Sequence, residues 1–427
     1  MKRFHIFSLV GVVALSVLAV AVAHSPRKAA DGRDKEESPA GEAEMINQDA
    51  GTADRRLVKA TTGFGFKLYA TLASQGADKS IFISPASVAM ALAMTYNGAE
   101  AETKQAMGQA LGFDSLSLDE LNRGFSQLRA ALASPDARVR LEIANSLWAK
   151  KSVRFKPDFV QRDQKFFGAE VTSLDFGDPA SVTRINSWVS SKTNGKIDKI
   201  LDQIDPMAVL YLINAIYFKG SWTNEFDKAK TKEDPFTLGT GSQTQVQMMH
   251  QSGDYRYLEA DGFQAVRLGY GKGDVGMYVF LPTERSNLAE FQKSLTYDNW
   301  ERWMTTFGKR PGDIGLPRFK LEYDVTLNDA LKSLGMGVAF DAARANFRGM
   351  ADTTDNISIS RVKHKSFVEV NEEGTEAAAA TSVGMVTTSM PVQRKRFQMI
   401  VNRPFFFSIR NDTTGTVLFM GSIVDPR

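Results

Sequence analysis

Cysteine is absent from this chain of 427 residues, and histidine occurs only four times. Without cysteine the protein has no disulfides, no thiol nucleophile and no thiolate ligand for a metal. The histidines are His5, His24, His250 and His364, and no two of them have the spacing of metal ligands. No cluster of carboxylates stands out in the sequence either, so we expect neither a metal site nor a cofactor.

The serine hydrolase motif G-x-S-x-G is also missing. His364 could in principle act as a general base, but it lies in "VKHKSFVEV", where the strand-like pattern favours a structural, hydrogen-bonded histidine. The segment "GKGDVG" (Gly271–Gly276) matches the dinucleotide motif G-x-G-x-x-G, which requires a strand before it and a helix after it. Strand-like runs flank this segment on both sides, so we interpret it as a hairpin turn.

The sequence has neither a strong excess of one charge nor an internal repeat. Its 52 basic and 49 acidic residues leave a formal charge of +3, which is too balanced to predict nucleic-acid binding. The basic run Arg394–Arg396 is interpreted as part of a solvated loop. With 43% hydrophobic and 24% charged residues, the composition is that of a globular protein that is long enough to bury a large core.

The N-terminal residues have the features of an export signal. A basic head precedes an apolar run, Ile6–Ala23, which ends in the small-residue pattern Ala-Val-Ala. We therefore predict a signal peptide over residues 1–23 and a secreted or otherwise extracytoplasmic protein. The apolar run is near the lower length limit for a membrane span, so an uncleaved anchor is the alternative, and only that anchor would bring the protein to a membrane. Residues 24–56 are mostly polar and are predicted to form a disordered linker.

A folded domain is predicted over residues 57–427. From Leu57 to Leu72, core-type side chains recur at steps of three and four residues, which predicts one face of a helix. The run Ile81–Ile83 is typical of a strand, and Ser84 follows it as a good N-cap for a second helix. Proline at the next position and Gly98 at the far end fit the start and the end of that helix.

Further strand-like runs alternate with helical patterns along the rest of the chain. They are Val209–Phe218, Ala265–Tyr270, Gly276–Pro282, Ser366–Val370, Phe405–Ile409 and Thr416–Val424. The last two are joined by "RNDTTG", which suits a hairpin turn, and Val325–Leu334 is predicted to be helical. No linker-like break follows Leu57, so the patterns indicate a single α+β domain.

The segment "GTEAAAATSVGMVTTSMP" (Gly374–Pro391) is too long for an ordinary turn, has no aromatic residue and carries one charge. In a strand, Thr375 and Ala377 would share one face, which could be buried, while Glu376 would lie on the other face in water. Alanine favours a helix, whereas the threonine and valine residues that follow favour a strand. We therefore predict a segment that is exposed in one state and forms a strand in another. The alternative is a small-residue surface loop that does not switch.

Several motifs, in the same order along the chain, resemble those of the serpins, a family of serine protease inhibitors. They are "IFISPASVAMALAMTYNGA", "INSWVSSKTNGKI", "NAIYFKGSW", "VQMMHQSG", "LPRF", "VNEEGTEAAAAT", "NRPFFFSI" and "LFMGSIVDP", between about Leu57 and Pro426. The resemblance implies the serpin fold, in which mixed helices surround three β-sheets and a reactive-centre loop is exposed. It identifies an inhibitory serpin, which we expect to be a bacterial-like, exported monomer.

The resemblance also implies that the protein inhibits a protease and catalyses nothing itself. The protease attacks the loop and forms an acyl-enzyme, and the cut loop then inserts into the main sheet and distorts the protease before the ester is hydrolysed. One alternative is a non-inhibitory serpin that acts as a carrier or chaperone. Another is an unrelated secreted hydrolase.

The family pattern assigns two groups of site residues. The hinge of the loop consists of Glu372, Glu373, Gly374, Thr375, Glu376, Ala377, Ala378, Ala379, Ala380 and Thr381. Its small side chains, without proline or bulky charge, favour inhibition. A polar network that controls opening of the main sheet is assigned to Ser84, Ser87, Asn214 and His364. Trp222 matches the aromatic position where insertion begins, and an ordinary core tryptophan is the alternative.

The reactive bond is predicted between Thr388 and Ser389 from the family's spacing after the hinge glycine, with Met385 and Met390 as runners-up. Because the primary pocket of a protease selects the side chain before the cut, Thr388 suggests an elastase-like or subtilisin-like serine protease. If either methionine contacts the target, its oxidation to the sulfoxide is expected to weaken inhibition.

Overall fold

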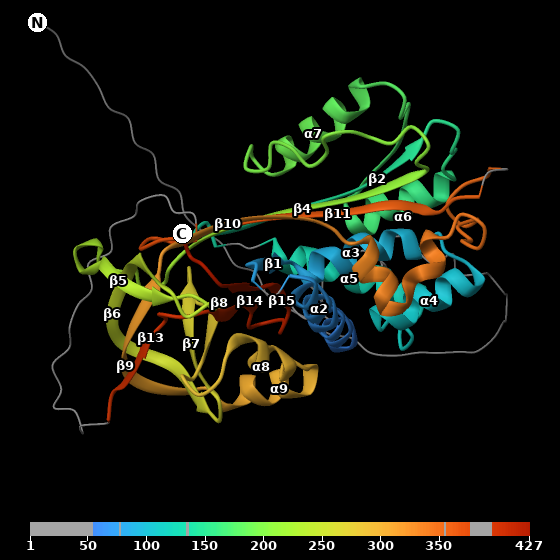
Figure 1. The fold of residues 1–427 in the computed structure, drawn as a ribbon. Helices are drawn as coiled ribbons and strands as arrows, with labels where there is room; N and C mark the ends of the chain where they lie inside the picture. Colours follow the sequence, from blue (N-terminus) through green and yellow to red (C-terminus); the bar gives the residue numbers. More distant parts are fainter. Residues whose placement is uncertain (1–53, 77, 134–135, 354–355, 376–394) are drawn as a thin grey trace, which may run out of the picture. The chain divides into compact units, whose positions relative to one another are not determined.

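The computed structural model describes residues 54–76, 78–133, 136–353, 356–375 and 395–427, which fall within one compact unit (Figure 1). Helix α2 (Arg55–Gln75) begins two residues before the boundary expected at Leu57. The reason is local, because the side chain of Asp54 accepts a hydrogen bond from the backbone N–H of Arg56 and caps the helix. The predicted face of this helix is buried from Leu57 to Leu72.

The second helix forms as its capping residues predict. Strand β1 (Ile81–Ile83) leads into α3 (Pro85–Tyr96), and the Oγ of Ser84 accepts a hydrogen bond from the backbone N–H of Ser87. Every residue of α3 is buried. Its many alanines allow this, because small side chains let β4 (Leu210–Ser221) and β15 (Val417–Ile423) pack closely against the helix.

The described strands form two sheets. The six-stranded sheet contains, in spatial order, β10 (Phe319–Thr326), β11 (Ile359–Val370), β12 (Gly374–Thr375), β4, β2 (Val139–Lys150) and β3 (Glu170–Leu174). In Figure 1 helix α7 (Ala180–Lys192) lies over one face of this sheet, and α3 lies on the other side.

The nine-stranded sheet runs in the order β1, β15, β14, β8, β7, β6, β9 and β13, and β5 pairs with β6 outside this path. Its remaining strands are β5 (Lys232–Thr237), β6 (Gln243–Ala260), β7 (Phe263–Tyr270), β8 (Val275–Pro282), β9 (Gly308–Pro317), β13 (Phe397–Ile400) and β14 (Phe405–Asn411). Three sheets were expected, but the structure has two. Strand β6 runs without a break and pairs with β5 in its first part and with β7 in its last part, so the second and third expected sheets form one continuous sheet.

Helices surround these sheets. They are α4 (Ala101–Leu111), α5 (Leu118–Leu132), α6 (Pro157–Phe167), α8 (Leu288–Lys293), α9 (Tyr297–Thr306), α10 (Asn328–Leu331) and the short turns η1 (Lys228–Lys230), η2 (Lys332–Met336) and η3 (Gly337–Phe340). The predicted α+β class is therefore confirmed, with strands and helices interleaved along the chain.

The predicted turn Gly271–Gly276 connects β7 to β8 as expected, and Gly271 and Gly273 both have positive φ. The hairpin of β14 and β15 is also confirmed. The helix predicted over Val325–Leu334 is wrong at its start. Val325 and Thr326 end strand β10, opposite His364 and Lys363, because the cross-strand ladder outweighs the local helical pattern.

Candidate functional site

The start of the predicted hinge is already a strand in the six-stranded sheet. Strands β4 and β11 pair directly and in parallel from Leu210 and Ile359 up to Tyr217 and Phe367. Beyond that point the two strands separate, and β12 lies between them, antiparallel to both. Within the described residues, the sheet therefore holds two residues of an additional strand, and β4 and β11 close the position below them by pairing with each other.

Gly374 is the residue that lets the chain enter the sheet. Its φ is +151°, and a Cβ at this position would lie 2.1 Å from the carbonyl oxygen of Gly220. Backbone oxygen cannot move away cheaply at that distance, so only glycine fits here. The next residue, Thr375, is fully buried and faces Gly220 in the ladder.

Thr375 is held by a buried aromatic pair. The hydroxyls of Thr375 and Tyr270 share a hydrogen bond of 2.6 Å, and burial raises the pKa of the Tyr270 phenol. The ring of Tyr270 stacks on Trp222 with 4.4 Å between the ring centroids. Trp222 in turn fixes the backbone at the start of the hinge, because its backbone N–H donates to the Glu373 carbonyl and its indole Nε1–H to the Asn371 carbonyl, both at 2.9 Å.

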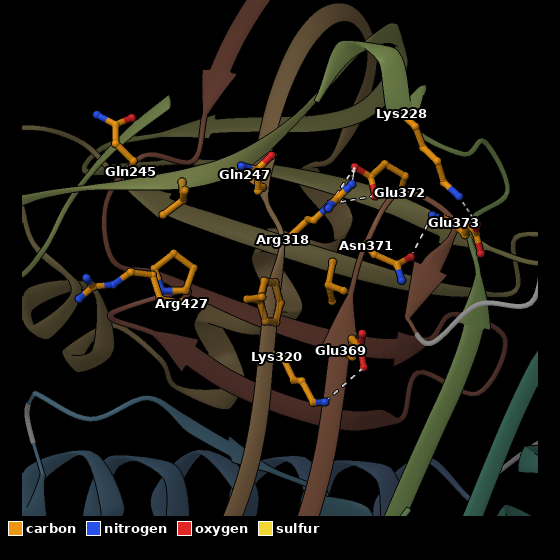
Figure 2. A pocket seen from close by; sticks show the side chains of 14 residues that line it. Lys228, Gln245, Gln247, Arg318, Lys320, Glu369, Asn371, Glu372, Glu373 and Arg427 are labelled. Carbon is orange, nitrogen blue, oxygen red and sulfur yellow. Dashed lines mark hydrogen bonds and ion pairs between the residues drawn. The ribbon is translucent and has the colours of Figure 1, made fainter. Parts of the chain in front are cut away.

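Two acidic residues of the hinge, Glu372 and Glu373, anchor it through ion pairs (Figure 2). Arg318 donates to both carboxylate oxygens of Glu372, from Nε at 2.8 and 2.9 Å, and the hydroxyl of Thr231 donates to the same carboxylate at 2.5 Å. Burial raises the pKa of Glu372, but the hydrogen bonds from Arg318 and Thr231 outweigh it and leave the pKa below its usual range. Glu373 pairs with the exposed Lys228 at 2.5 Å. An open cavity of about 630 Å³ lies beside these groups.

A second polar cluster lies farther down the sheet, where β4 and β11 pair directly. The Nδ1–H of His364 donates to Oδ1 of Asn214 at 2.5 Å, and the ring Nε2 accepts from the backbone N–H of Ser84 at 3.3 Å. The amide of Asn214 donates to Oγ of Ser87 at 2.6 Å and to Oδ1 of Asn145 at 2.5 Å. The network therefore joins β11, β4, β2 and the start of α3, all in the protein interior.

His364 must remain neutral in this cluster. Burial lowers its pKa to about 3, and a charged imidazolium would place an N–H at Nε2 against the donor N–H of Ser84. The imidazole is thus a fixed link between the strands, and its two hydrogen-bond partners, the Asn214 side chain and the backbone N–H of Ser84, are not nucleophiles.

We expect this burial to make the stability depend on pH between about 6.5 and 3. The folded-state pKa of His364 lies below the unfolded value of 6.5, so the contribution is complete above pH 6.5 and is lost as the pH falls, because the unfolded chain takes up the proton first. The slope attributable to His364 is at most about 1.4 kcal/mol per pH unit. Urea unfolding of the wild type and of His364→Gln at pH 7 and pH 5 measures it. Equal pH dependence in both proteins would contradict the prediction.

The structure brings together the four polar residues predicted for the network, namely Ser84, Ser87, Asn214 and His364. Trp222 is not among them. Trp222 follows Asn214 by eight residues along β4 and its end, which at the rise per residue of a strand is about 25 Å, and it lies at the hinge. It is a buried aromatic whose backbone N–H bonds to the hinge, and its role at the start of insertion stays a prediction.

Several residues of the two clusters were not predicted from the sequence to belong to the site. They are Asn145, Tyr270, Thr231, Arg318 and Lys228. Asn145 has a local signal, because it is a polar residue in the middle of a strand that is otherwise buried. Arg318 belongs to the quoted motif "LPRF", which did not by itself indicate a partner. Tyr270, Thr231 and Lys228 have no local signal, since they lie in ordinary strand ends and loops. Hinge residues Glu376 to Thr381, the predicted bond Thr388–Ser389, and Met385 and Met390 lie outside the described residues.

Comparison with known proteins decides the family. The sequence model of the family described as Serpin (serine protease inhibitor) matches residues 59–426. The chain belongs to the serpin family. Serpin B8 of Homo sapiens is 38% identical to this serpin over 379 residues, which cover 87% of the chain and 99% of the relative. Leukocyte elastase inhibitor of Homo sapiens is 36% identical over 383 residues, which cover 87% of the chain and 100% of the relative.

Solved structures agree with this assignment. The crystal structure of the thermophilic serpin tengpin in its native state has a TM-score of 0.81 and 35% identity, and the match covers 87% of this chain and 95% of tengpin. The predicted serpin fold is therefore confirmed. Because the family consists of protease inhibitors by name, the prediction of a protease inhibitor rather than an enzyme is confirmed as well.

The predicted secreted or extracytoplasmic location is wrong. Serpin B8, Serpin B6 and leukocyte elastase inhibitor are intracellular clade B serpins, and the similarity to them points away from secretion. Among the described residues, no helix is both long enough and apolar enough to cross a membrane. Residues 1–23, predicted as a signal peptide or anchor, and the predicted linker up to residue 53 lie outside the described part of the chain.

Proposed function

We propose that this serpin traps a serine protease by completing its six-stranded sheet with its own cleaved loop. One observation carries the proposal: β12 already occupies the top of the position between β4 and β11, and these strands pair with each other directly below it. A loop that continues from Thr375 would separate β4 from β11 and form a full strand between them.

The hydrogen-bond pattern gives such an insertion a driving force. The ladder between β4 and β11 is parallel, whereas β12 is antiparallel to both neighbours. Insertion would thus replace one parallel ladder by two antiparallel ladders, which are slightly more stable per residue. Each added hydrogen bond contributes about 1 kcal/mol net. Ordering the loop costs about 1 to 2 kcal/mol per residue, so cleavage, which frees one end of the loop, is needed to start the process.

The domain is proposed to act as a monomer over residues 57–427, with the reactive bond at Thr388–Ser389. A protease with a small primary pocket is the proposed target class. Two points support this choice, the small side chain of Thr388 and the similarity to a relative that is named leukocyte elastase inhibitor. The network around His364 is proposed to resist separation of β4 and β11 until cleavage has occurred.

Mixing the full chain with an elastase-like protease tests this function. We expect a complex that survives denaturing electrophoresis, and mass spectrometry of the released peptide is expected to place the cut after Thr388. The cleaved serpin is expected to melt well above the intact serpin, because its sheet has gained a strand. A chain that is cut but neither traps the protease nor gains thermal stability would instead be a non-inhibitory carrier.

A further inference from the structure

A row of cations crosses three neighbouring strands of the nine-stranded sheet. Arg256 of β6 lies directly opposite Arg267 of β7 and, on its other side, directly opposite Lys309 of β9. Directly opposed side chains on antiparallel strands are close neighbours, and like charges there are destabilising. The arrangement therefore needs anionic partners.

The acidic partners in the described structure are too few for this row. Asp412 accepts from Nε of Arg267 at 2.7 Å and lies 3.9 Å from Nη1 of Arg256, and it also pairs with Arg410 at 2.5 Å. Lys309 pairs with Asp254 at 3.5 Å. Four cations thus share two carboxylates. Arg267 is only 11% exposed, so water screens this excess of positive charge poorly at the centre of the row.

The three cations of the row line one cavity of about 230 Å³. This volume is below the usual range for organic ligands and suits a small ion with its bound water. Gly269 lines the cavity, and the side chains of Thr223 and Arg267 lie close over it, because a Cβ there would lie 2.8 Å from Oγ1 of Thr223 and 3.2 Å from Nη1 of Arg267. The guanidinium of Arg267 donates from Nε to Asp412 and from Nη2 to the carbonyl of Gly273, whereas its Nη1 makes no hydrogen bond within the described residues.

We propose that this cavity is a binding site for a small inorganic oxyanion of the phosphate or sulfate class. Arg267 and Arg256 would hold it, because planar guanidinium groups match the oxygens of a tetrahedral anion and form short, charge-assisted hydrogen bonds with them. Lys309 also lines the cavity, together with Asp254, the carboxylate that pairs with it. The anion would relieve the repulsion between the opposed arginines, which gives the site a physical reason to be filled.

The wall of the cavity connects the site to the hinge. Trp222 and Phe226 both line the cavity, and their backbone N–H groups donate to the carbonyls of Glu373 and Glu372, both at 2.9 Å. Binding of an anion is therefore expected to change the fluorescence of Trp222 and to raise the melting temperature of the intact protein. Neither readout depends on protease inhibition.

Calorimetric titration of the full chain with inorganic phosphate tests the proposal, with sodium chloride at matched ionic strength as the control salt. We expect saturable binding at one site, weakened at least about tenfold by Arg256→Gln, whose side chain is 44% exposed and can change without unfolding the protein. Arg310→Gln makes the same charge change on β9 outside the cavity and is expected to leave binding within about twofold of wild type.

A second pair of variants tests the shape of the cavity without changing its charge. Gly269→Ala places a methyl group 2.8 Å from Oγ1 of Thr223 and 3.2 Å from Nη1 of Arg267, so these side chains have to shift, and phosphate binding is expected to weaken about as strongly as in Arg256→Gln. Gly239→Ala, where a Cβ meets nothing within 4 Å, is the matched control. Absence of saturable binding, equal effects of phosphate and chloride, or equal phosphate affinity in Arg256→Gln and Arg310→Gln would each overturn the proposal.

Discussion

Replacing Thr375 by arginine is expected to convert this serpin from an inhibitor of its target protease into a substrate. Thr375 is the last described residue of β12 and is fully buried between β4 and β11. Every further residue of an inserted loop has to follow it into the sheet. A guanidinium at this position has no acidic partner among the groups that contact Thr375, and burying an unpaired charge costs several kcal/mol.

The arginine is expected to slow insertion so strongly that hydrolysis of the acyl-enzyme overtakes it. The yield of trapped protease should fall more than about tenfold, since about 1.4 kcal/mol already corresponds to a factor of ten in the ratio of the two outcomes. Cleavage itself should continue at a similar rate, because the reactive bond is unchanged. Denaturing electrophoresis of the reaction mixture measures trapped complex and cleaved serpin together.

Thr375→Ser is the matched control, because serine retains the hydroxyl that bonds to Tyr270 and is smaller than threonine. It is expected to inhibit like the wild type. The intact arginine variant should also lose the contact with Tyr270 and release the hinge from the top of the sheet, which limited proteolysis at the hinge would detect. A Thr375→Arg protein that traps protease with undiminished yield would rule out insertion through this position.

Local patterns predicted the elements that carry the site. Ser84 and Pro85 fixed the start of α3, and the glycines after Tyr270 fixed the turn between β7 and β8. Those signals lie within a few residues of the feature that they specify. The family resemblance then supplied the polar residues around His364, which patterns of hydrophobicity alone do not single out.

The contacts of the hinge could not be predicted in this way. Tyr270 and Thr375 are 105 residues apart, and Arg318 and Glu372 are 54 residues apart. Their meeting depends on the registers of β11 and β4, which the whole sheet determines. The same long-range pairing explains the error at Val325, where a partner strand overrides a local helical pattern. The extracytoplasmic location of the protein was predicted from residues 1–23, which lie outside the domain that matches the family model, and the similarity to Serpin B8, Serpin B6 and leukocyte elastase inhibitor contradicts it.

Removing the positive charge of Arg318 is expected to destabilise the protein more than removing the negative charge of Glu372. The side chain of Glu372 is 3% exposed, whereas that of Arg318 is 43% exposed. In Arg318→Met the carboxylate remains buried with Thr231 as its other side-chain hydrogen-bond partner, which costs about 3 kcal/mol. In Glu372→Gln the guanidinium can turn into water, and a loss of about 1 kcal/mol is expected.

Urea unfolding of both single variants and of the double variant measures this asymmetry. The double variant should be more stable than the sum of the single effects predicts, because no unpaired carboxylate remains in it. Lys228→Gln is the control for the neighbouring pair with Glu373, whose lysine is 66% exposed, and we expect no measurable change there. Equal losses in Arg318→Met and Lys228→Gln would show that the buried position of Glu372 has no energetic consequence.

The pair of Arg318 and Glu372 also predicts how the stability of the protein changes with pH. The pKa of Glu372 in the folded protein is lowered from 4.5, so its contribution to stability is present above about pH 4.5 and is lost as the pH falls toward the folded-state pKa. In Arg318→Met burial is no longer offset by the guanidinium, so the carboxylate takes up its proton at higher pH. The difference in stability between wild type and Arg318→Met should therefore begin to shrink above pH 4.5, as the variant takes up its proton, and shrink further below pH 4.5, as the wild type does. The slope from His364, present in both proteins, cancels in this difference. A difference that stays constant from pH 7 to pH 4 would mean that Arg318 stabilises the hinge by packing rather than by its charge.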